Sequence, residues 1–518
     1  MAKKFEALIV RYARGLVRWR YLVLLASLLA AGGMLSGVQH LSFSSDFRVY
    51  FGPDNPQLQA FNEIQQVYTK NDNTLYVVEP PGDTAFNPDT LRLVRELTDR
   101  AWELPCVVRV DSVSNYQHTE AEGDDLKVAD LVPPVDELSA ADIDRIRQIA
   151  INEPLLKNRL SSSTGHVLAV NVTHQLPEES NTELPTAVAA SRDLRDELLA
   201  AYPGHSIYLS GTNMMSNAFA EASQNDMATL FPLMYLLLIV ILYLLLRSIT
   251  ATFASLMVIL LSTGAAMGLT GYIGIQLTAP SVLAPIVITT LAVANAVHIL
   301  VSMFAQMREG QAKADALVES LRLNFIPVLL TSITTALGLL SINFADSPPL
   351  ADLGNMSAMG AMLALGFAVT LLPALVAILP IRPPKQRRSW LSGRMEAFGT
   401  WVVKRRRPVL VGSSIVILGL MALMPLNTAN DKFVHYFDER IQFRTDSDFM
   451  AENITGLYTM EFSLPAPNGV SDPDYLANLD AFKQWWLQDP RVMHVASISD
   501  IFKRLNKNMH GDDPAWYR

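Results

Sequence analysis

The chain has 518 residues, of which 50% are hydrophobic and only 18% are charged, and its mean hydropathy is positive at +0.22. This composition excludes an ordinary soluble enzyme and is typical of a protein with several membrane spans. The formal net charge of −9 argues against a nucleic acid as partner. The single cysteine, Cys106, excludes an intrachain disulfide.

Residues 1–20 have the pattern of a basic amphipathic helix. Leu8, Tyr12 and Leu16 fall largely on one helical face, and lysines and arginines supply the charges. Such a helix suits the inner surface of a membrane. Residues 21–38 follow as a long apolar run without a distinct small-residue cleavage site, so we expect an uncleaved first span rather than a signal peptide.

Residues 39–226 are polar and acidic, and strand-like segments alternate with helical ones. Two successive β-α-β patterns predict an α+β, ferredoxin-like extracytoplasmic domain. The expected strands and helices cover residues 75–78, 88–104, 107–113, 140–159, 166–172, 184–201 and 206–210. The acidic stretch 117–136 shows no metal-ligand spacing and is expected to be a solvated loop.

Further apolar runs of spanning length predict a polytopic α-helical membrane protein with seven spans. Five spans form a bundle over residues 228–380, a basic amphipathic linker covers 381–407, and the seventh span covers 409–426. The five spans of the bundle cover approximately 230–246, 252–273, 282–303, 325–344 and 356–379. Basic loops, including Arg387 and Arg388, alternate with acidic or neutral loops, which places the N-terminus in the cytoplasm and the large polar segments outside.

The chain also contains a tandem repeat with a spacing of about 385–390 residues. The matching segments include Phe47/Tyr50/Phe51 with Phe433/Tyr436/Phe437, and 107–114 (VVRVDSVS) with 492–499 (VMHVASIS). A repeat of the same sense is typical of two bundle halves related by an axis along the membrane normal. Residues 427–518 are then a partial second extracytoplasmic domain, and we expect the sequence to be incomplete.

Asn295 and His298 are the polar side chains of interest in the fourth span, Val282–Met303. Polar groups in hydrocarbon are costly and often functional. With Ser302 they fall at i, i+3 and i+7, which predicts one shared helical face. Histidine changes charge near neutral pH, as a proton relay requires. The alternative is a neutral histidine that donates to a neighbouring helix and has no role in transport.

The fifth span offers a complementary polar face, with hydroxyls at four of five consecutive positions. We expect Thr331, Thr334 and Thr335 to line a path beside Asn295 and His298. Each hydroxyl could instead bond a carbonyl of its own helix. The sequence contains no nucleophile with a base, no zinc spacing and no phosphate loop, so we expect no enzymatic activity, metal or cofactor.

The runs PVLLTSITTALGLLSINFADSPPLADLG and GAMLALGFAVTLLPALV resemble MMPL-type transporters of the RND superfamily, and the order of spans and domains fits them. The five-span unit also resembles the sterol-sensing module of Patched-like proteins. The resemblance implies an exporter of hydrophobic or lipid-like molecules in a bacterial inner membrane, driven by the proton gradient. The implied partners are this substrate, membrane lipids, and either further copies of the chain or accessory proteins.

One position departs from the family pattern. Many members carry an aspartate in the fourth span, in a run like A-D-S-x-H, and this aspartate carries the coupling proton. The matching run here is Ala294–His298 (ANAVH), so an amide stands at Asn295. The resemblance therefore implies His298 as the titrating group and Asn295 as its polar partner. The alternatives are a non-transporting sterol-sensing-like receptor or accessory subunit, or an inactive truncated fragment.

Overall fold

The computed structural model describes residues 2–44, 46–68, 72–123, 125–177, 180–384, 390–428 and 432–518. The chain forms two compact units. The membrane unit comprises Met1–Ser42 and Asp226–Phe433, and the extramembrane unit comprises Phe43–Asn225 and Val434–Arg518. Arg387 and Arg388 of the predicted basic linker lie outside the described residues.

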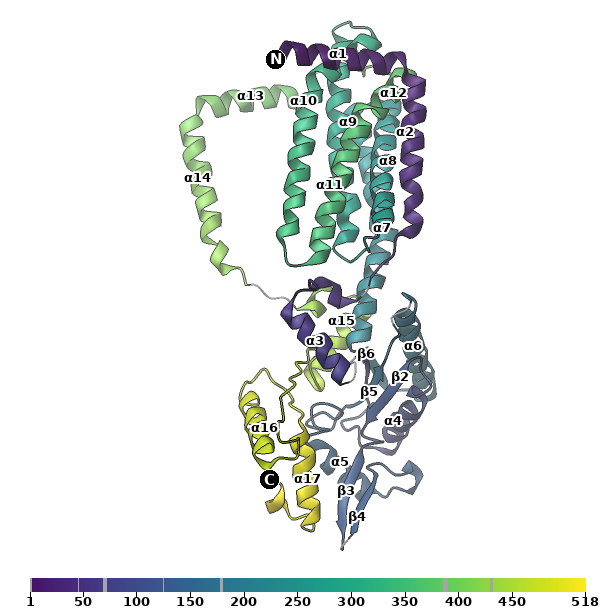
Figure 1. Ribbon diagram of the computed structural model, residues 1–518, viewed down its shortest axis with the longest axis vertical. Coiled ribbons are helices and arrows are strands. Elements are labelled where there is room, and N and C mark those ends of the chain that lie inside the picture. The colour runs from purple at the N-terminus through teal and green to yellow at the C-terminus, as the bar shows by residue number, and fades with distance from the viewer. Residues whose placement is uncertain are drawn as a thin grey trace. The chain divides into compact units, whose positions relative to one another are not determined.

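The described part of the chain contains seven helical segments that are long and apolar enough to cross a membrane, which confirms the predicted class of polytopic α-helical protein (Figure 1). They are α2 (Arg20–Leu35, extended by the 3-10 turn η1, Ser36–His40), α7 (Thr212–Leu246), α8 (Ile249–Ile273), α9 (Ala284–Arg308), α10 (Lys313–Leu340), α11 (Pro348–Val369) with α12 (Leu371–Ile378), and α14 (Arg406–Ala422).

The predicted amphipathic segment forms helix α1 (Ala2–Arg18), which crosses the ends of the spanning helices in Figure 1. Ile9, Ala13 and Leu16 are buried against the bundle. The Tyr12 hydroxyl donates to the carbonyl of Val369 at 3.1 Å, at the end of α11. A second surface helix, α13 (Trp390–Lys404), precedes α14. Part of the apolar face of α1 therefore packs on the bundle.

Small residues allow the spanning helices to approach closely, as is common in membrane proteins. A Cβ added to Gly268 of α8 would lie 1.9 Å from the carbonyl oxygen of Met34 in α2. A Cβ on Gly360 of α11 would lie 2.2 Å from the Ile288 side chain of α9. These two contacts hold α2, α8, α9 and α11 at separations that no larger side chain permits.

The extramembrane unit contains a four-stranded antiparallel sheet with the strand order β2-β5-β1-β6. The elements follow the predicted β-α-β-β-α-β order, with a hairpin and α5 inserted between the two halves. Their bounds are β1 (Asp72–Glu79), α4 (Pro88–Ala101), β2 (Val107–Ser112), β3 (Gln117–Glu122), β4 (Asp125–Asp130), α5 (Ala140–Asn152), β5 (Leu168–His174), α6 (Glu183–Ala201) and β6 (Ser206–Ser210).

The segment 117–136, predicted to be a solvated loop, is largely a β-hairpin, so that prediction is wrong. β3 pairs with β4 over its whole length, and Gly123 provides the positive φ of the turn. Thr119 is buried, and its hydroxyl donates to the Asn508 side chain at 2.7 Å. The abundance of acidic residues led to the wrong prediction. Acidic side chains indicate that a segment is exposed to solvent, but an exposed segment can still pair its backbone in a hairpin. Asp124 lies outside the described residues.

The second copy of the repeat keeps two helix positions of the first. Its helices are α15 (Gln442–Asn453), α16 (Pro473–Trp486) and α17 (Ile498–Met509), of which α15 and α16 have helical counterparts in the first copy. α15 begins 386 residues after α3 (Pro56–Val67), since 442 − 56 = 386, and α16 begins 385 residues after α4, since 473 − 88 = 385. In contrast, the run at 492–497, which matches β2, forms no strand.

Helix α15 of the second copy packs on the sheet of the first copy. Alternate residues of β1 face opposite sides. Tyr76 faces α6, where its hydroxyl donates to the Ser191 carbonyl at 3.2 Å. Leu75 and Val77 face the other side and cluster with Met450 of α15. Because both faces are covered, the apolar run of β1 is continuous rather than alternating.

Candidate functional site

The centre of the predicted site is a buried polar contact between α9 and α10. Asn295 of α9 is 4% exposed, and its side-chain amide donates to the Ser332 hydroxyl of α10 at 3.2 Å. Ser332 is equally buried. Neither group can exchange its partner for bulk water in hydrocarbon, so this hydrogen bond joins the two helices at a defined register.

His298 lies in a different environment from Asn295, although only three residues separate them. Its side chain is exposed on the membrane unit, whereas Asn295 faces α10. Three residues correspond to a displacement of about 60° around a helix, which is enough to cross from the packed face to the open face. Ser302, the third residue of the predicted shared face, is half-buried. The packing of α10 against α9 thus divides the predicted polar face.

The predicted lining threonines bond mainly within their own helix. Thr331 donates to the carbonyl of Pro327 at 2.8 Å, and Thr334 donates to that of Leu330 at 2.8 Å. Both threonines are exposed, and Thr335 is half-buried. These hydroxyls lie on the same span as Ser332, but the geometry matches the local alternative that the sequence left open. Their role as a lining therefore remains a prediction.

Ser332 is the hydroxyl that crosses to α9. From sequence it was one of the four clustered hydroxyls of the fifth span, and it was not singled out as a lining residue. The signal was present in the spacing of the buried residues Val328, Ser332 and Ala336, each four positions from the next. Residues at this spacing share one helix face. A serine among small apolar residues on the packed face is better placed to reach a neighbouring helix than threonines on the open face.

Other hydroxyl groups connect α9 to three neighbouring helices. Ser320 of α10 donates to the Ile299 carbonyl at 2.6 Å. Thr289 lies 3.2 Å from the Tyr235 hydroxyl of α7 and 3.4 Å from that of Thr263 in α8. No Asp, Glu, Lys or Arg is fully buried among the described residues of the membrane unit. α9 is therefore fixed by neutral hydrogen bonds, and the His298 side chain lies on its open face.

The structure thus defines a multi-pass membrane protein with a helical bundle and an extramembrane α+β unit. The sequence profile of the MMPL family matches residues 50–411, and the chain belongs to this family. The chain is also similar to the siderophore exporter MmpL5 of Mycobacterium tuberculosis (strain CDC 1551 / Oshkosh), with 25% identity over 290 residues. That alignment covers 52% of this chain and 29% of MmpL5.

The family match includes both parts of the predicted architecture. It begins in the extramembrane unit, before β1, and continues through α13 into the first residues of α14. Members of the MMPL family are transporters. The predicted resemblance to MMPL-type proteins is therefore confirmed, whereas the roles of individual residues at α9 and α10 stay predictions.

Proposed function

We propose that this chain acts in the export of hydrophobic or lipid-like molecules and that the proton gradient drives this export. Its membership of the MMPL family carries the proposal, because the match spans the extramembrane domain together with the bundle. In this proposal the extramembrane domain receives the substrate and the bundle couples its movement to protons. The similarity to a siderophore exporter supports export as the direction of transport.

In this proposal His298 is the group that takes up and releases the proton. Imidazole titrates near neutral pH, and ionisable groups inside spans commonly belong to proton relays. Asn295 holds α10 through Ser332 and cannot itself titrate. A change in the charge of His298 would then alter the contacts that the open face of α9 makes, while the Asn295–Ser332 contact keeps the helix register.

We place the chain in a bacterial inner membrane with α1 in the cytoplasm and the extramembrane unit outside. The arginines at the ends of the spans support this orientation. Cys106 is exposed and is the only cysteine of the chain, so it reports the side of the extramembrane unit directly. A membrane-impermeant maleimide should label Cys106 in spheroplasts without prior lysis. Labelling only after lysis would reverse the orientation.

Transport is tested with the full chain in proteoliposomes that contain a pH-sensitive dye and a fluorescent hydrophobic probe. An imposed pH gradient should drive probe movement together with proton flux. His298→Ala should reduce both by at least about tenfold, as expected for loss of a proton-transfer group. Thr290→Val is the matched control, because Thr290 is exposed on the same helix and bonds only the carbonyls of Ile286 and Val287.

Unchanged proton-coupled movement in His298→Ala would overturn the relay assignment. A wild-type chain that moves neither protons nor probe, and that gains no proton flux in Asn295→Asp, would favour the alternative of a non-transporting receptor or accessory subunit. In that case the amide at Asn295 would mark a bundle that keeps the fold without coupling.

A further inference from the structure

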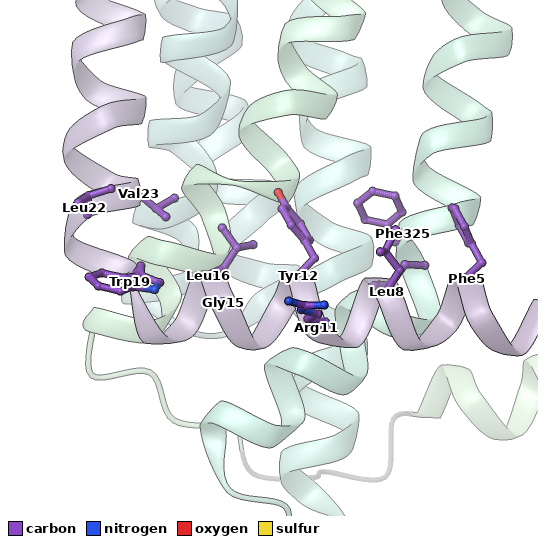
Figure 2. Close-up of a pocket in the computed structure, with 11 residues that line it drawn as sticks. Phe5, Leu8, Arg11, Tyr12, Gly15, Leu16, Trp19, Leu22, Val23 and Phe325 are labelled. Carbon is purple, nitrogen blue, oxygen red and sulfur yellow. The ribbon is translucent and has the colours of Figure 1, made fainter.

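A large apolar groove lies between α1, the start of α2 and α10, away from the Asn295–Ser332 contact (Figure 2). Its volume is about 900 Å³. Leu8, Tyr12 and Leu16 project from one side of α1 toward the ends of the spanning helices, as Figure 2 shows. Phe325 of α10 meets Tyr12 edge to face, with ring centroids 6.0 Å apart. The groove therefore presents an almost wholly apolar wall.

A second cavity of about 470 Å³ continues this groove along α2. It shares Tyr12, Leu16, Leu22 and Val23 with the first cavity and reaches Met34, between α2 and α11. From Leu22 to Met34 the helix rises about 18 Å. Half of a hydrocarbon core is about 15 Å thick. The combined groove thus has the length of one membrane leaflet and extends along the direction in which an acyl chain lies.

A cationic group lies at the α1 end of the groove. Arg11 lines it, and its guanidinium forms no ion pair with any acidic side chain in the described part of the chain. The one acidic residue of α1, Glu6, lies 3.6 Å from Arg322 instead. Trp19 lines the groove where α1 meets α2 (Figure 2), and indole rings favour the headgroup level of a membrane. A free guanidinium beside an apolar groove is suited to a phosphate with an attached hydrocarbon chain.

We propose that this groove binds an anionic phospholipid from the leaflet on which α1 lies. The lipid phosphate pairs with Arg11, and one acyl chain lies along α2 toward Met34. The lining of this site includes neither Asn295 nor His298, so it can be tested separately from the proposed proton relay.

Native mass spectrometry of the purified full chain tests the headgroup contact. The chain is titrated with dioleoyl phosphatidylglycerol and, separately, with dioleoyl phosphatidylcholine. Wild type should retain phosphatidylglycerol in preference, and Arg11→Gln should reduce that preference about fivefold, the value expected for one cation at a membrane surface. Arg14→Gln is the matched control, because Arg14 is exposed on the same helix and does not line the groove.

Filling the groove tests the acyl-chain contact separately. Gly15 lines the groove and a Cβ added there meets no atom within 4 Å, so Gly15→Leu places its side chain in the groove and also favours the helix. Gly15→Leu should lose retained lipid of both kinds, whereas Gly15→Ala should keep it. Equal effects of Arg11→Gln and Arg14→Gln, or unchanged retention in Gly15→Leu, would overturn the proposal. Loss of transport in His298→Ala with lipid retention intact would separate the two proposals.

Discussion

Asn295 and Ser332 form their hydrogen bond where no water can replace either partner, so the cost of breaking it can be measured. We expect Ser332→Ala to destabilise the bundle by about 1 kcal/mol, within the range found for hydrogen bonds between membrane helices. Asn295→Ala should lower the free energy of unfolding by a similar amount, since each variant removes one partner of the same hydrogen bond. Thermal unfolding of the two single variants and the double variant in detergent gives the coupling free energy between the two side chains. If the losses of stability in the single variants add up to the loss in the double variant, the 3.2 Å contact contributes no free energy.

Asp446 of α15 provides a second test at the residue scale, in the extramembrane unit. It is 1% exposed and accepts from the Leu209 backbone amide at 2.9 Å and from the Gln442 side chain at 2.6 Å. Burial raises the pKa of Asp446 above its ordinary value, and these two donors offset the effect only in part. The raised pKa means that the folded protein favours the protonated carboxyl.

The consequence for pH follows from this sign. The pKa of Asp446 is higher in the folded state than in the unfolded state, where it is about 4. Asp446 therefore contributes stability below about pH 4, and this contribution is lost as the pH rises through the pKa of the folded state. Wild type should therefore lose stability relative to Asp446→Asn between about pH 4 and neutral pH. The difference between their thermal midpoints across that range measures the effect. A difference that does not change with pH would show that the pKa of Asp446 is ordinary.

At the scale of elements, the contact of Gly268 with α2 determines how closely the first span can pack. An added Cβ would lie 1.9 Å from backbone, which cannot move aside as a flexible side chain can. Gly268→Ala should therefore lower the free energy of unfolding by roughly 1–3 kcal/mol, the range found when a packed core is overfilled. Gly338→Ala is the control, because a Cβ there meets no atom within 4 Å and the helix gains up to about 1 kcal/mol in propensity. Equal thermal midpoints for the two variants would contradict the tight contact.

The existence of the elements could be predicted from sequence, but several of their boundaries could not. Hydropathy located all seven spans, yet it placed the start of the second at residue 230, whereas α7 begins at Thr212. Hydropathy detects only the apolar part of a helix. α7 begins earlier, in residues that are too polar to register as a membrane span. The hairpin β3–β4 was missed for a related reason: β4 is exposed along its whole length, and Thr119 is the one buried residue of the two strands, so they show no alternating apolar pattern.

The candidate site was only partly accessible from the sequence. Spacing located Asn295 in a buried environment, but it could not show where the boundary between packed and open faces falls on α9. That boundary depends on the position of α10, which reaches Asn295 through Ser332 and leaves His298 exposed. A count of hydroxyls likewise favoured Thr331 and Thr334, which bond their own helix. The sequence pattern of one helix shows which polar residues are present. The position of the neighbouring helices determines which of these residues contact one another.

At the scale of the whole molecule, the repeat determines how the extramembrane unit is completed. α3 and α15 are equivalent in the repeat, yet α15 covers the sheet built by the first copy. Phe449 of α15 stacks on Tyr208 of β6 with ring centroids 3.8 Å apart, and Ser447 lies 2.8 Å from the Ser210 hydroxyl. Sequence similarity between copies predicts a helix at α15 but not the copy on which it packs. The first sheet depends on residues more than 200 positions away for one of its faces.

His298 raises the remaining question at this scale, namely which medium meets the open face of α9. A titratable side chain facing lipid is costly, so in the membrane this face should meet water or protein rather than acyl chains. In a Cys106→Ser background, His298→Cys should react with a water-soluble maleimide in native membranes. Leu237→Cys is the control, because Leu237 is an exposed apolar residue of α7 and should remain unmodified in lipid.

The two cysteine variants distinguish the possible surroundings of α9 by rate. Thiolate is the reactive form and requires water, so reaction at residue 298 would place an aqueous path beside α9, as a proton relay needs. Faster reaction at residue 298 than at residue 237, followed by protection when the hydrophobic transport probe is added, would link that path to the proposed export. Equal and negligible reaction at both positions would instead mean that His298 faces lipid or a dry protein contact, and the assignment of His298 as the proton carrier would then have to be abandoned.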